Sequence, residues 1–559
     1  MSFIPMTPAE MQDRHWDYLD IIIISGDAYV DHPSFGAAII ARSLESEGFR
    51  VGIIAQPDWK RVEDFQQLGK PRLFFGITAG NMDSMINHYT AQRKLRHDDA
   101  YSPGGIAGLR PDRATFVYTN IIKNLYKGVP VVIGGIEASL RRIAHYDYWQ
   151  DKIRNSILSD SKADVLIYGM AEKPICELAN LMARGVSVAD IQSLPSSVVF
   201  TRIAPYVKDG VEEGDSSQIR DIILPPADTC KDKLTFYRMT KLFTEFSNTR
   251  VLFQSSGGRW IKHNPPAAEL STTEMDKIYA LPFEYAPHPI YRGTIIPAFE
   301  QIKDSLTSHR GCYGGCNFCA IACHQGRKIQ SRSQDSIVAE ALKHSGTISD
   351  VGGPTANMYA SRCKLGFPDS CKRRSCLYPA LCLNLVLTHD EQLVLLNKIS
   401  NLPRIKHVFI ASGIRHDMAI SNDKYTKEIA IKYTGGRLKL APEHCVPRIL
   451  RLMGKPEISS YEAFCSKYFA FTTAQGLKRQ VIPYLIIGHP GSNKADAIAL
   501  RDWLKKHNIK VEQVQEFTPT PMSISTCMYY TGLDFDSGEP IEIPSPGQVR
   551  EQKKIVLWN

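Results

Sequence analysis

Three cysteines stand close together in the segment HRGCYGGCNFCAIACHQGR, which covers residues 309–327. The spacing Cys312-x3-Cys316-x2-Cys319 places three thiols in one loop, directly after a predicted strand at 305–309. Thiolates are the usual protein ligands of iron-sulfur clusters, and a 4Fe-4S cube held by three of them leaves one iron open for another ligand. The spacing is therefore compatible with a 4Fe-4S cluster that has an open iron.

The same loop also suits a structural zinc site, in which Cys323 or His324 would supply the fourth ligand of a closed tetrahedron. If it binds no metal, Cys323 is a small apolar thiol packed near the loop. Gly311, Gly314 and Gly315 allow the positive φ angles that a loop around a bound group often requires. The cysteine spacing alone leaves both kinds of metal centre open.

Four further cysteines lie within twenty residues, in CKLGFPDSCKRRSCLYPALC. Such a set can hold an auxiliary iron-sulfur cluster or a structural zinc, because both accept four thiolates. Free reduced thiols are the third interpretation. The hypothesis of a second metal site rests on Cys363, Cys371, Cys376 and Cys382.

A basic stretch surrounds this second cysteine group. Such a stretch is usually a solvated face, but it can also stabilise an anionic cluster or meet an anionic substrate, RNA included. Its members are Arg362, Lys364, Lys372, Arg373 and Arg374.

Short apolar runs alternate with helical patterns in the first part of the chain, which predicts βαβ units and a parallel sheet. The expected strands cover residues 20–25, 51–56, 72–78, 129–134 and 164–169, and the first expected helix covers residues 34–48.

A second alternating series follows and predicts six βα units, typical of a barrel or part of one. Its expected strands cover residues 305–309, 348–351, 407–411, 438–440, 480–487 and 511–517. The helices between them are expected at 335–343, 390–399, 424–432, 461–474 and 494–507. Ligand-binding groups should then lie at the carboxyl ends of these strands.

The predicted fold class is α/β, with a doubly wound N-terminal domain followed by a partial (β/α)6 barrel. The doubly wound domain is expected at 1–190 and a connector, punctuated by prolines, at 191–295. The barrel is expected at 296–535 with a cysteine-rich insertion at 358–385, and a loosely ordered tail at 536–559.

Further motifs accompany the cysteine loop, in which Phe318 precedes the third cysteine. They are VGGPTANMY (351–359), ASGIRHD (411–417), LAPEH (440–444), GHPGS (488–492) and EFTPTPMSISTCMYYTG (516–532). In the N-terminal part they are GDAYVDHPSFG (26–36), AQPDW (55–59) and GGIEASLRR (134–142). Together they resemble the YgiQ-type family of radical S-adenosylmethionine (radical SAM) proteins, from about residue 17 to 535.

The resemblance implies an enzyme that binds S-adenosylmethionine at the open iron. It implies reductive cleavage to methionine and a 5′-deoxyadenosyl radical, followed by hydrogen abstraction from an unknown substrate. An electron donor such as a flavodoxin or a ferredoxin is the expected partner. No catalytic residue follows from the motifs.

Several residues are expected to hold S-adenosylmethionine by the same resemblance. The turn at 352–355 matches a Gly-Gly-Glu-like turn that offers carbonyls to the amino group, although proline replaces glutamate. Ser412 and Arg415 would meet the ribose or the carboxylate. The full set is Phe318, Gly352, Gly353, Pro354, Thr355, Ser412, Arg415, Glu443, His444, Gly488 and His489.

Two of these pairs have a plainer interpretation as well. Glu443 and His444 follow a predicted strand and would serve the ribose hydroxyls or the substrate, or else only begin a helix. Gly488 and His489 end the next strand, where a glycine would let the backbone approach adenine.

A cobalamin-binding domain precedes the barrel in many radical SAM proteins and carries a D-x-H-x-x-G motif. In this sequence Asp31 and His32 are adjacent, so the motif is not reproduced. The resemblance implies a cobalamin-binding-like fold, whereas the sequence argues against cobalamin itself, and His32 can simply cap a loop.

Composition excludes several classes of protein. The chain has 559 residues with 67 Lys and Arg against 58 Asp and Glu, a net charge of +9 that permits nucleic acid but does not indicate it. The longest apolar runs are far shorter than the roughly 20 residues of a membrane span. The N-terminus lacks the pattern of a signal peptide, so a cytoplasmic location is expected.

Two other functions compete with the favoured one. The first is a non-catalytic iron-sulfur or zinc binding protein that acts as a redox sensor or a scaffold. The second is an RNA-modifying radical SAM enzyme, which only the basic stretch near the second cysteine group suggests.

Overall fold

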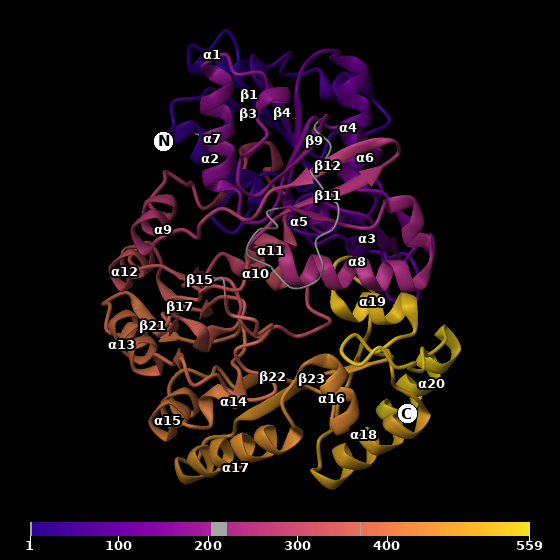
Figure 1. Ribbon diagram of the computed structural model, residues 1–559. Helices are drawn as coiled ribbons and strands as arrows, with labels where there is room; N and C mark the ends of the chain where they lie inside the picture. The colour runs from indigo at the N-terminus through magenta and orange to yellow at the C-terminus, as the bar shows by residue number, and fades with distance from the viewer. Residues whose placement is uncertain (1–2, 203–220, 369, 559) are drawn as a thin grey trace. The chain divides into compact units, whose positions relative to one another are not determined.

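The computed structural model describes residues 3–202, 221–368 and 370–558. The chain forms two compact units, Met1–Ala268 with Ala280–Lys303, and Glu269–Tyr279 with Asp304–Asn559 (Figure 1). Each unit has its own apolar clusters of buried side chains. None of the helices in the described part of the chain combines the length and apolar character that a membrane span requires.

The first unit is built on a sheet in which five neighbouring strands, at one end of the sheet, are parallel. They are β1 (Ile21–Ser25), β3 (Val51–Ala55), β4 (Phe74–Thr78), β5 (Val131–Ile133) and β8 (Val165–Ile167). Their order is β3-β1-β4-β5-β8, and β1 is in register with both of its neighbours. Every residue of β1 is buried, as expected for a parallel strand that is covered on both faces.

Helices cover both faces of these strands. α2 (Gly36–Ser46) packs against α7 (Glu172–Ala183), and α4 (Ala114–Leu125) packs against α6 (Ile157–Ser161). The two pairs lie on either side of the strands in Figure 1. The predicted α/β class with a large parallel sheet is therefore confirmed, and the expected strands agree with the observed ones to within about two residues.

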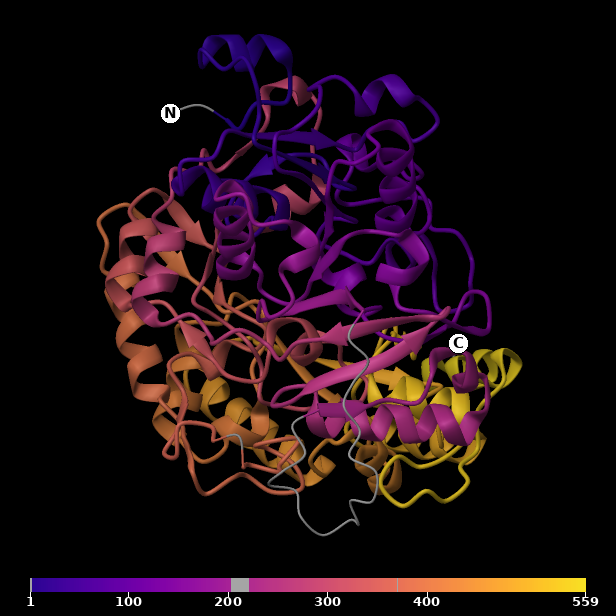
Figure 2. The same ribbon diagram turned by 45° about the horizontal axis from the view of Figure 1, so that its top comes forward.

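The interval 191–295 is not the connector that the sequence predicted. It adds β9 (Ser197–Thr201), β12 (Arg259–His263), β11 (Val251–Ser256) and β10 (Asp221–Ile223) to the sheet, which thereby has nine strands. β9 is antiparallel to β8 and covers the edge that β8 would otherwise expose. Proline punctuation obscured these short strands. In the same interval α8 (Lys233–Phe246) packs against β11 (Figure 2).

The second unit contains parallel strands in separate short ladders. β14 (Ser305–Thr307) pairs with β18 (Asp350–Gly352), and β17 (Gly346–Ile348) pairs with β21 (Ile405–Val408). β22 (Arg437–Glu443) pairs with β23 (Gln480–Ile487), which pairs with β24 (Gln515–Glu516). All six predicted strand positions are occupied, while closure into a (β/α)6 barrel stays a prediction.

Helices alternate with these strands close to the predicted bounds. They are α12 (Gln334–Ala341), α13 (His389–Ser400), α15 (Asp423–Ile431), α17 (Ile458–Ala474) and α18 (Lys494–Lys506). The apolar faces of α12, α13, α15 and α17 share one core with the strands, in which Leu306, Val351, Leu440 and Phe464 are buried together. The buried leucines of α18 belong to a second cluster. This core fixes the strands whose carboxyl ends carry the candidate site.

The end of the chain is ordered, contrary to the expected loose tail. α20 (Pro546–Leu557) begins with a capping box, in which Ser545 and Gln548 satisfy each other's backbone. Val549 and Val556 on this helix pack with Leu500 and Leu504 of α18. Proline, glycine and acidic residues before 546 suggested a loop, but two valines seven residues apart supply the buried face of a helix.

We predict that Gly26→Ala destabilises the first unit. A Cβ at Gly26 would overlap the carbonyl of Ala79, so the ends of β1 and β4 would be forced apart at a cost of about 1–3 kcal/mol. Gly36→Ala is the control, because its Cβ would meet only Asn81 Oδ1 at 3.5 Å. Urea unfolding followed by circular dichroism measures both variants, and an equal midpoint for the two would contradict the prediction.

Candidate metal centre and ligand site

The loop that carries the three cysteines is closed at its base by backbone contacts. β15 (His309–Arg310) pairs with β16 (Gln330–Ser331), and Cys312 N donates to Gly326 O at 3.1 Å. A Cβ at Gly311, where φ is +86°, would overlap Lys328 O, so the turn into the loop requires glycine. The two ends of the loop are therefore held side by side, and the three thiols lie in the segment between them.

The three thiols of this loop lie near one another. Cys312 Sγ and Cys316 Sγ lie 3.3 and 3.9 Å from the position that a Gly314 Cβ would take. Cys319 interacts electrostatically with both, and burial raises the pKa of Cys312 and of Cys319. Buried thiols of this kind stay protonated unless a metal or a cation stabilises the thiolate.

These thiols do not have the spacing of ligands to a single metal ion. Within residues 3–202, 221–368 and 370–558, no three His, Cys, Asp or Glu side chains are close enough to share one ion. A cube of iron and sulfide is several atoms wide and separates its thiolates further than one ion does. The arrangement fits a cluster better than the zinc alternative.

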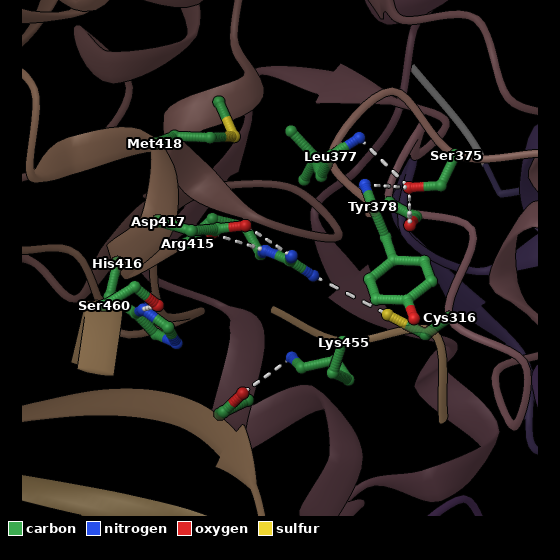
Figure 3. Close-up of polar contacts among 12 residues, drawn as sticks. Cys316, Ser375, Leu377, Tyr378, Arg415, His416, Asp417, Met418, Lys455 and Ser460 are labelled. Atoms are coloured by element: carbon green, nitrogen blue, oxygen red, sulfur yellow. Dashed lines mark hydrogen bonds and ion pairs between the residues drawn. The ribbon is translucent and has the colours of Figure 1, made fainter. Parts of the chain in front are cut away.

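Arg415 provides the nearest cation to the thiols. Its Nη1 donates to Cys316 Sγ at 3.6 Å, while Nε and Nη2 donate to Asp417 at 2.9 and 2.6 Å (Figure 3). Burial alone would raise the pKa of Asp417, but the charge and hydrogen bonds of Arg415 outweigh it and hold that pKa below its usual 3.8. This buried, bidentate ion pair with Asp417 fixes the orientation of the Arg415 guanidinium.

The backbone of Arg415 is fixed by a residue of the GGPTANM segment. Arg415 N donates to Asn357 Oδ1 at 2.8 Å, and Asn357 Nδ2 donates to Arg415 O at 3.0 Å. Asn357 lies in the short helix η6 (Ala356–Met358), directly after the glycine turn. Two motifs that are about sixty residues apart are thus joined by a reciprocal amide contact.

A second buried ion pair lies at the end of β22. Lys455 Nζ donates to Ala441 O at 2.6 Å and lies 3.7 Å from Glu443 Oε1. Burial raises the pKa of Glu443, although Lys455 and Arg415 act in the opposite direction. Glu443 has a φ of +70°, a conformation that is strained for a residue with a side chain. Lys455 belongs to no motif found in the sequence.

The glycine turn at 352–355 is packed tightly between strands. Gly352 O accepts from Ser308 N and Ser308 Oγ at 2.7 and 2.9 Å, so this carbonyl is already used within the protein. A Cβ at Gly352 would overlap Ser412 Oγ, and one at Gly353 would lie 2.7 Å from His309 O. Both positions therefore require glycine, which places the turn directly beside Ser412.

The other residues of this turn are half-buried, and Ser412 is held by an acidic neighbour. Thr355 Oγ1 donates to Pro354 O at 2.8 Å. Asp350 Oδ1 accepts from Ser412 N and Ser412 Oγ at 3.1 and 3.2 Å. The Ser412 side chain is thereby fixed at the carboxyl edge of the strands.

Gly488, His489 and His444 have structural contacts. A Cβ at Gly488 would lie 2.8 Å from a methyl group of Val549, so this glycine receives α20. His444 Nδ1 accepts from Val446 N at 3.1 Å, and burial lowers the pKa of His444 to about 3 and that of His489 to about 4. Both imidazoles are therefore neutral near pH 7.

A chain of contacts links His489 to the cysteine loop. His489 Nε2 and Ser525 Oγ are 2.7 Å apart, and Ser525 N donates to Asn317 O at 2.8 Å. Asn317 N donates to Met453 O at 2.9 Å, and Phe318 beside it is half-buried. The C-terminal motif therefore supports the segment between the second and third cysteines.

The structure brings Cys312, Cys316, Cys319, Arg415 and Glu443 into one interacting group. The sequence analysis missed Asp417, Lys455, Asn357, Asn317 and Ser525. All but Lys455 lie in motifs that it quoted, so motif membership was a signal for them, but only tertiary contacts show what they do.

A comparison with protein-family models matches residues 3–305 to the family described as Radical SAM N-terminal. A UPF0313 protein of Geobacter sulfurreducens is 47% identical and covers 100% of this chain and 93% of its own length. The UPF0313 protein YgiQ of Escherichia coli K12 is 44% identical over 99% of this chain and 83% of its own length. This chain belongs to the UPF0313 family.

The resemblance to YgiQ-type radical SAM proteins is thus confirmed. A solved structure of the radical S-adenosylmethionine methyltransferase TsrM from Kitasatospora setae, with tryptophan and a SAM analogue bound, is similar in fold. It is 14% identical, has a TM-score of 0.51 and covers 96% of this UPF0313 chain and 88% of its own. The family match and this fold place the UPF0313 protein among enzymes of the radical SAM superfamily.

The expectation that argued against cobalamin is corrected by the same comparison. A second structure of TsrM from Kitasatospora setae contains cobalamin and a [4Fe-4S] cluster. The earlier expectation rested on one short motif that this sequence lacks. TsrM, which this chain resembles in fold at a TM-score of 0.51, carries cobalamin, so the missing motif is not a ground for excluding it.

We predict that Arg415→Ala destabilises the second unit, because it leaves Asp417 buried without its cation. The expected loss in free energy of unfolding is about 3–5 kcal/mol, measured by urea denaturation at pH 7. Since the folded pKa of Asp417 is lowered, the pair stabilises the protein above pH 3.8 and this contribution fades as the pH falls below it.

The matched control is Arg362→Ala, which removes an exposed pair with Glu391 at 3.3 Å. Such pairs contribute about 0–1 kcal/mol. Equal losses for the two variants would show that Arg415 does not hold the buried charge.

Proposed function

We propose that this protein is a radical SAM enzyme that cleaves S-adenosylmethionine reductively to start hydrogen abstraction from a substrate. The observation that carries the proposal is the contact between Arg415 and Cys316 within a group of three interacting thiols. The group lies where several parallel strands end, which is where enzymes of this architecture bind ligands.

The donor set fits a 4Fe-4S cluster held by Cys312, Cys316 and Cys319. Gly314 N lies 3.4 Å from Cys312 Sγ, and the Arg415 guanidinium faces Cys316 Sγ, so these two sulfurs each have a donor that stabilises a thiolate. A cluster bound there would supply the electron that cleaves S-adenosylmethionine to methionine and a 5′-deoxyadenosyl radical. A reduced flavodoxin or ferredoxin would provide that electron.

Residues at the strand ends would orient S-adenosylmethionine. Arg415 is engaged by Asp417 and Cys316, so we assign the carboxylate of the methionine part to the buried ammonium of Lys455. The charge of Lys455 reaches both Cys312 and Glu443. Glu443 and the fixed hydroxyl of Ser412 are the acceptors that suit ribose hydroxyls.

The basic stretch does not favour the RNA-modifying alternative. Arg362 pairs with Glu391, Arg374 pairs with Asp536, and Arg373 donates to Ser375 O at 3.0 Å. Three members of the stretch therefore have partners within the protein.

The test is production of 5′-deoxyadenosine. We expect the anaerobically reconstituted chain, supplied with dithionite and S-adenosylmethionine, to form it, as measured by liquid chromatography and mass spectrometry. Cys312→Ala should reduce the product at least a hundredfold, because one cluster ligand is lost. Cys230→Ala is the control, since this buried thiol lies in the first unit.

A cluster-loaded sample that yields no 5′-deoxyadenosine would contradict the proposal. It would favour the non-catalytic iron-sulfur protein, the redox sensor or scaffold named above.

We further propose that the first unit binds cobalamin at the carboxyl ends of β1 and β4. The sheet order reverses between these strands, and such a switch point is where doubly wound sheets bind ligands. Asn87 Nδ2 and Tyr118 OH are buried and have no hydrogen-bond partner among the described residues. Tyr118 interacts with Asp27, which follows β1, and Asn87 lies in the helix Ser84–His88, which follows β4. Orphaned polar groups of this kind suit a ligand rich in amides.

Cobalamin binding is tested by gel filtration after incubation with hydroxocobalamin. We expect about one equivalent to co-elute with the protein, and Asn87→Leu should weaken binding about tenfold if it loses one hydrogen bond. Asn180→Leu on α7 is the control, because its amide bonds the surface residue Glu47. Elution of the protein without any corrinoid would refute this second proposal.

A further inference from the structure

The second cysteine group is not used by the proposed function. Cys363 lies in β19 (Arg362–Cys363), which pairs with β20 (Leu385–Val386). Leu385 N donates to Cys382 O at 3.0 Å, and Cys382 N donates to Cys376 O at 2.8 Å. Backbone hydrogen bonds therefore gather Cys363, Cys376 and Cys382 at the base of one loop.

The four thiols of this group lie close enough to interact. The Cys376 thiol interacts electrostatically with those of Cys382, Cys371 and Cys363. All four are free thiols, and they range from the buried Cys376 to the exposed Cys371. Four free thiols that come together from a segment of twenty residues are a possible set of metal ligands.

Arg327 provides an independent observation. Its guanidinium contacts Cys376 and interacts with Cys371. The side chain is half-buried, and its Nε atom is buried without a hydrogen-bond partner among the described residues. A cation with an unpartnered, buried nitrogen is unfavourable beside neutral thiols, whereas a thiolate-bound centre, which carries net negative charge, would compensate it.

The group also adjoins the first cysteine loop. Cys376 N donates to Tyr313 O at 3.1 Å, and Ser375 Oγ donates to Gly314 O at 2.6 Å. Cys312 packs against the apolar cluster that contains Tyr313 and Cys376. The backbone of Cys376 in the second group is therefore hydrogen-bonded directly to Tyr313, the residue that follows Cys312 in the first loop.

We propose that Cys363, Cys371, Cys376 and Cys382 bind a second iron-sulfur cluster, distinct from the one at Cys312, Cys316 and Cys319. Four thiolates complete the ligands of such a cluster, so its irons need no external ligand. Zinc also accepts four thiolates, but the thiols do not have the spacing for one ion among the described residues. The proposal does not depend on cleavage of S-adenosylmethionine.

The test measures iron, sulfide and zinc in the full chain after anaerobic reconstitution. We expect about eight irons per chain if both centres are cubes. The triple variant Cys312→Ala, Cys316→Ala, Cys319→Ala should keep about half of the iron, with the absorption and electron paramagnetic resonance spectrum of a cluster. The same variant forms no 5′-deoxyadenosine, so this readout is separate from activity.

Cys371→Ser is the complementary variant, because this exposed thiol can be changed with little effect on folding. This variant should lose iron from the second centre. Its formation of 5′-deoxyadenosine separately measures the state of the cluster at Cys312, Cys316 and Cys319. Cys527→Ser, a buried thiol outside both groups, is the control and should keep all the iron.

A folded triple variant that contains no iron overturns the proposal. So does one that contains zinc in place of iron, which would assign the four thiols to a structural zinc site.

Discussion

The candidate site depends on one buried cation that contacts both a carboxylate and a thiol of the cysteine loop. Arg415 gives two nitrogens to Asp417 and a third to Cys316, and its backbone is held by Asn357. A guanidinium buried without such partners would be costly, so each partner is needed for the others to stay in place. The cysteine loop, the glycine turn and the loop after β21 are therefore fixed together.

The rest of the second unit holds this arrangement by close packing. Gly352, Gly353 and Gly488 each lie where a Cβ would meet a neighbouring strand, loop or helix. On the far side of the cysteine loop, Asn317 contacts Ser525, which contacts His489. Interiors packed to this density transmit strain, which explains why motifs spread over two hundred residues contribute to one site.

The two cysteine groups share this framework. The second group is joined to the first loop through Cys376 and Tyr313, and Arg327 stands among its thiols. The first unit presents a different kind of edge, where the sheet order reverses and the strands end in glycines. Thiol chemistry and a polar sheet edge thus occupy separate units of one chain.

The sequence by itself determined the α/β class, most strand and helix positions, and the family, because hydrophobic periodicity and cysteine spacing are local properties. The interval 191–295 and the end of the chain were misjudged because Pro and Gly mask short strands and a capped helix. Only the tertiary structure decided that Arg415 contacts Cys316 and that Ser525 contacts Asn317. Such contacts join residues far apart in the chain, as Cys316 and Arg415 are. A local sequence pattern does not specify which distant side chain will be the hydrogen-bond partner of a buried charged group.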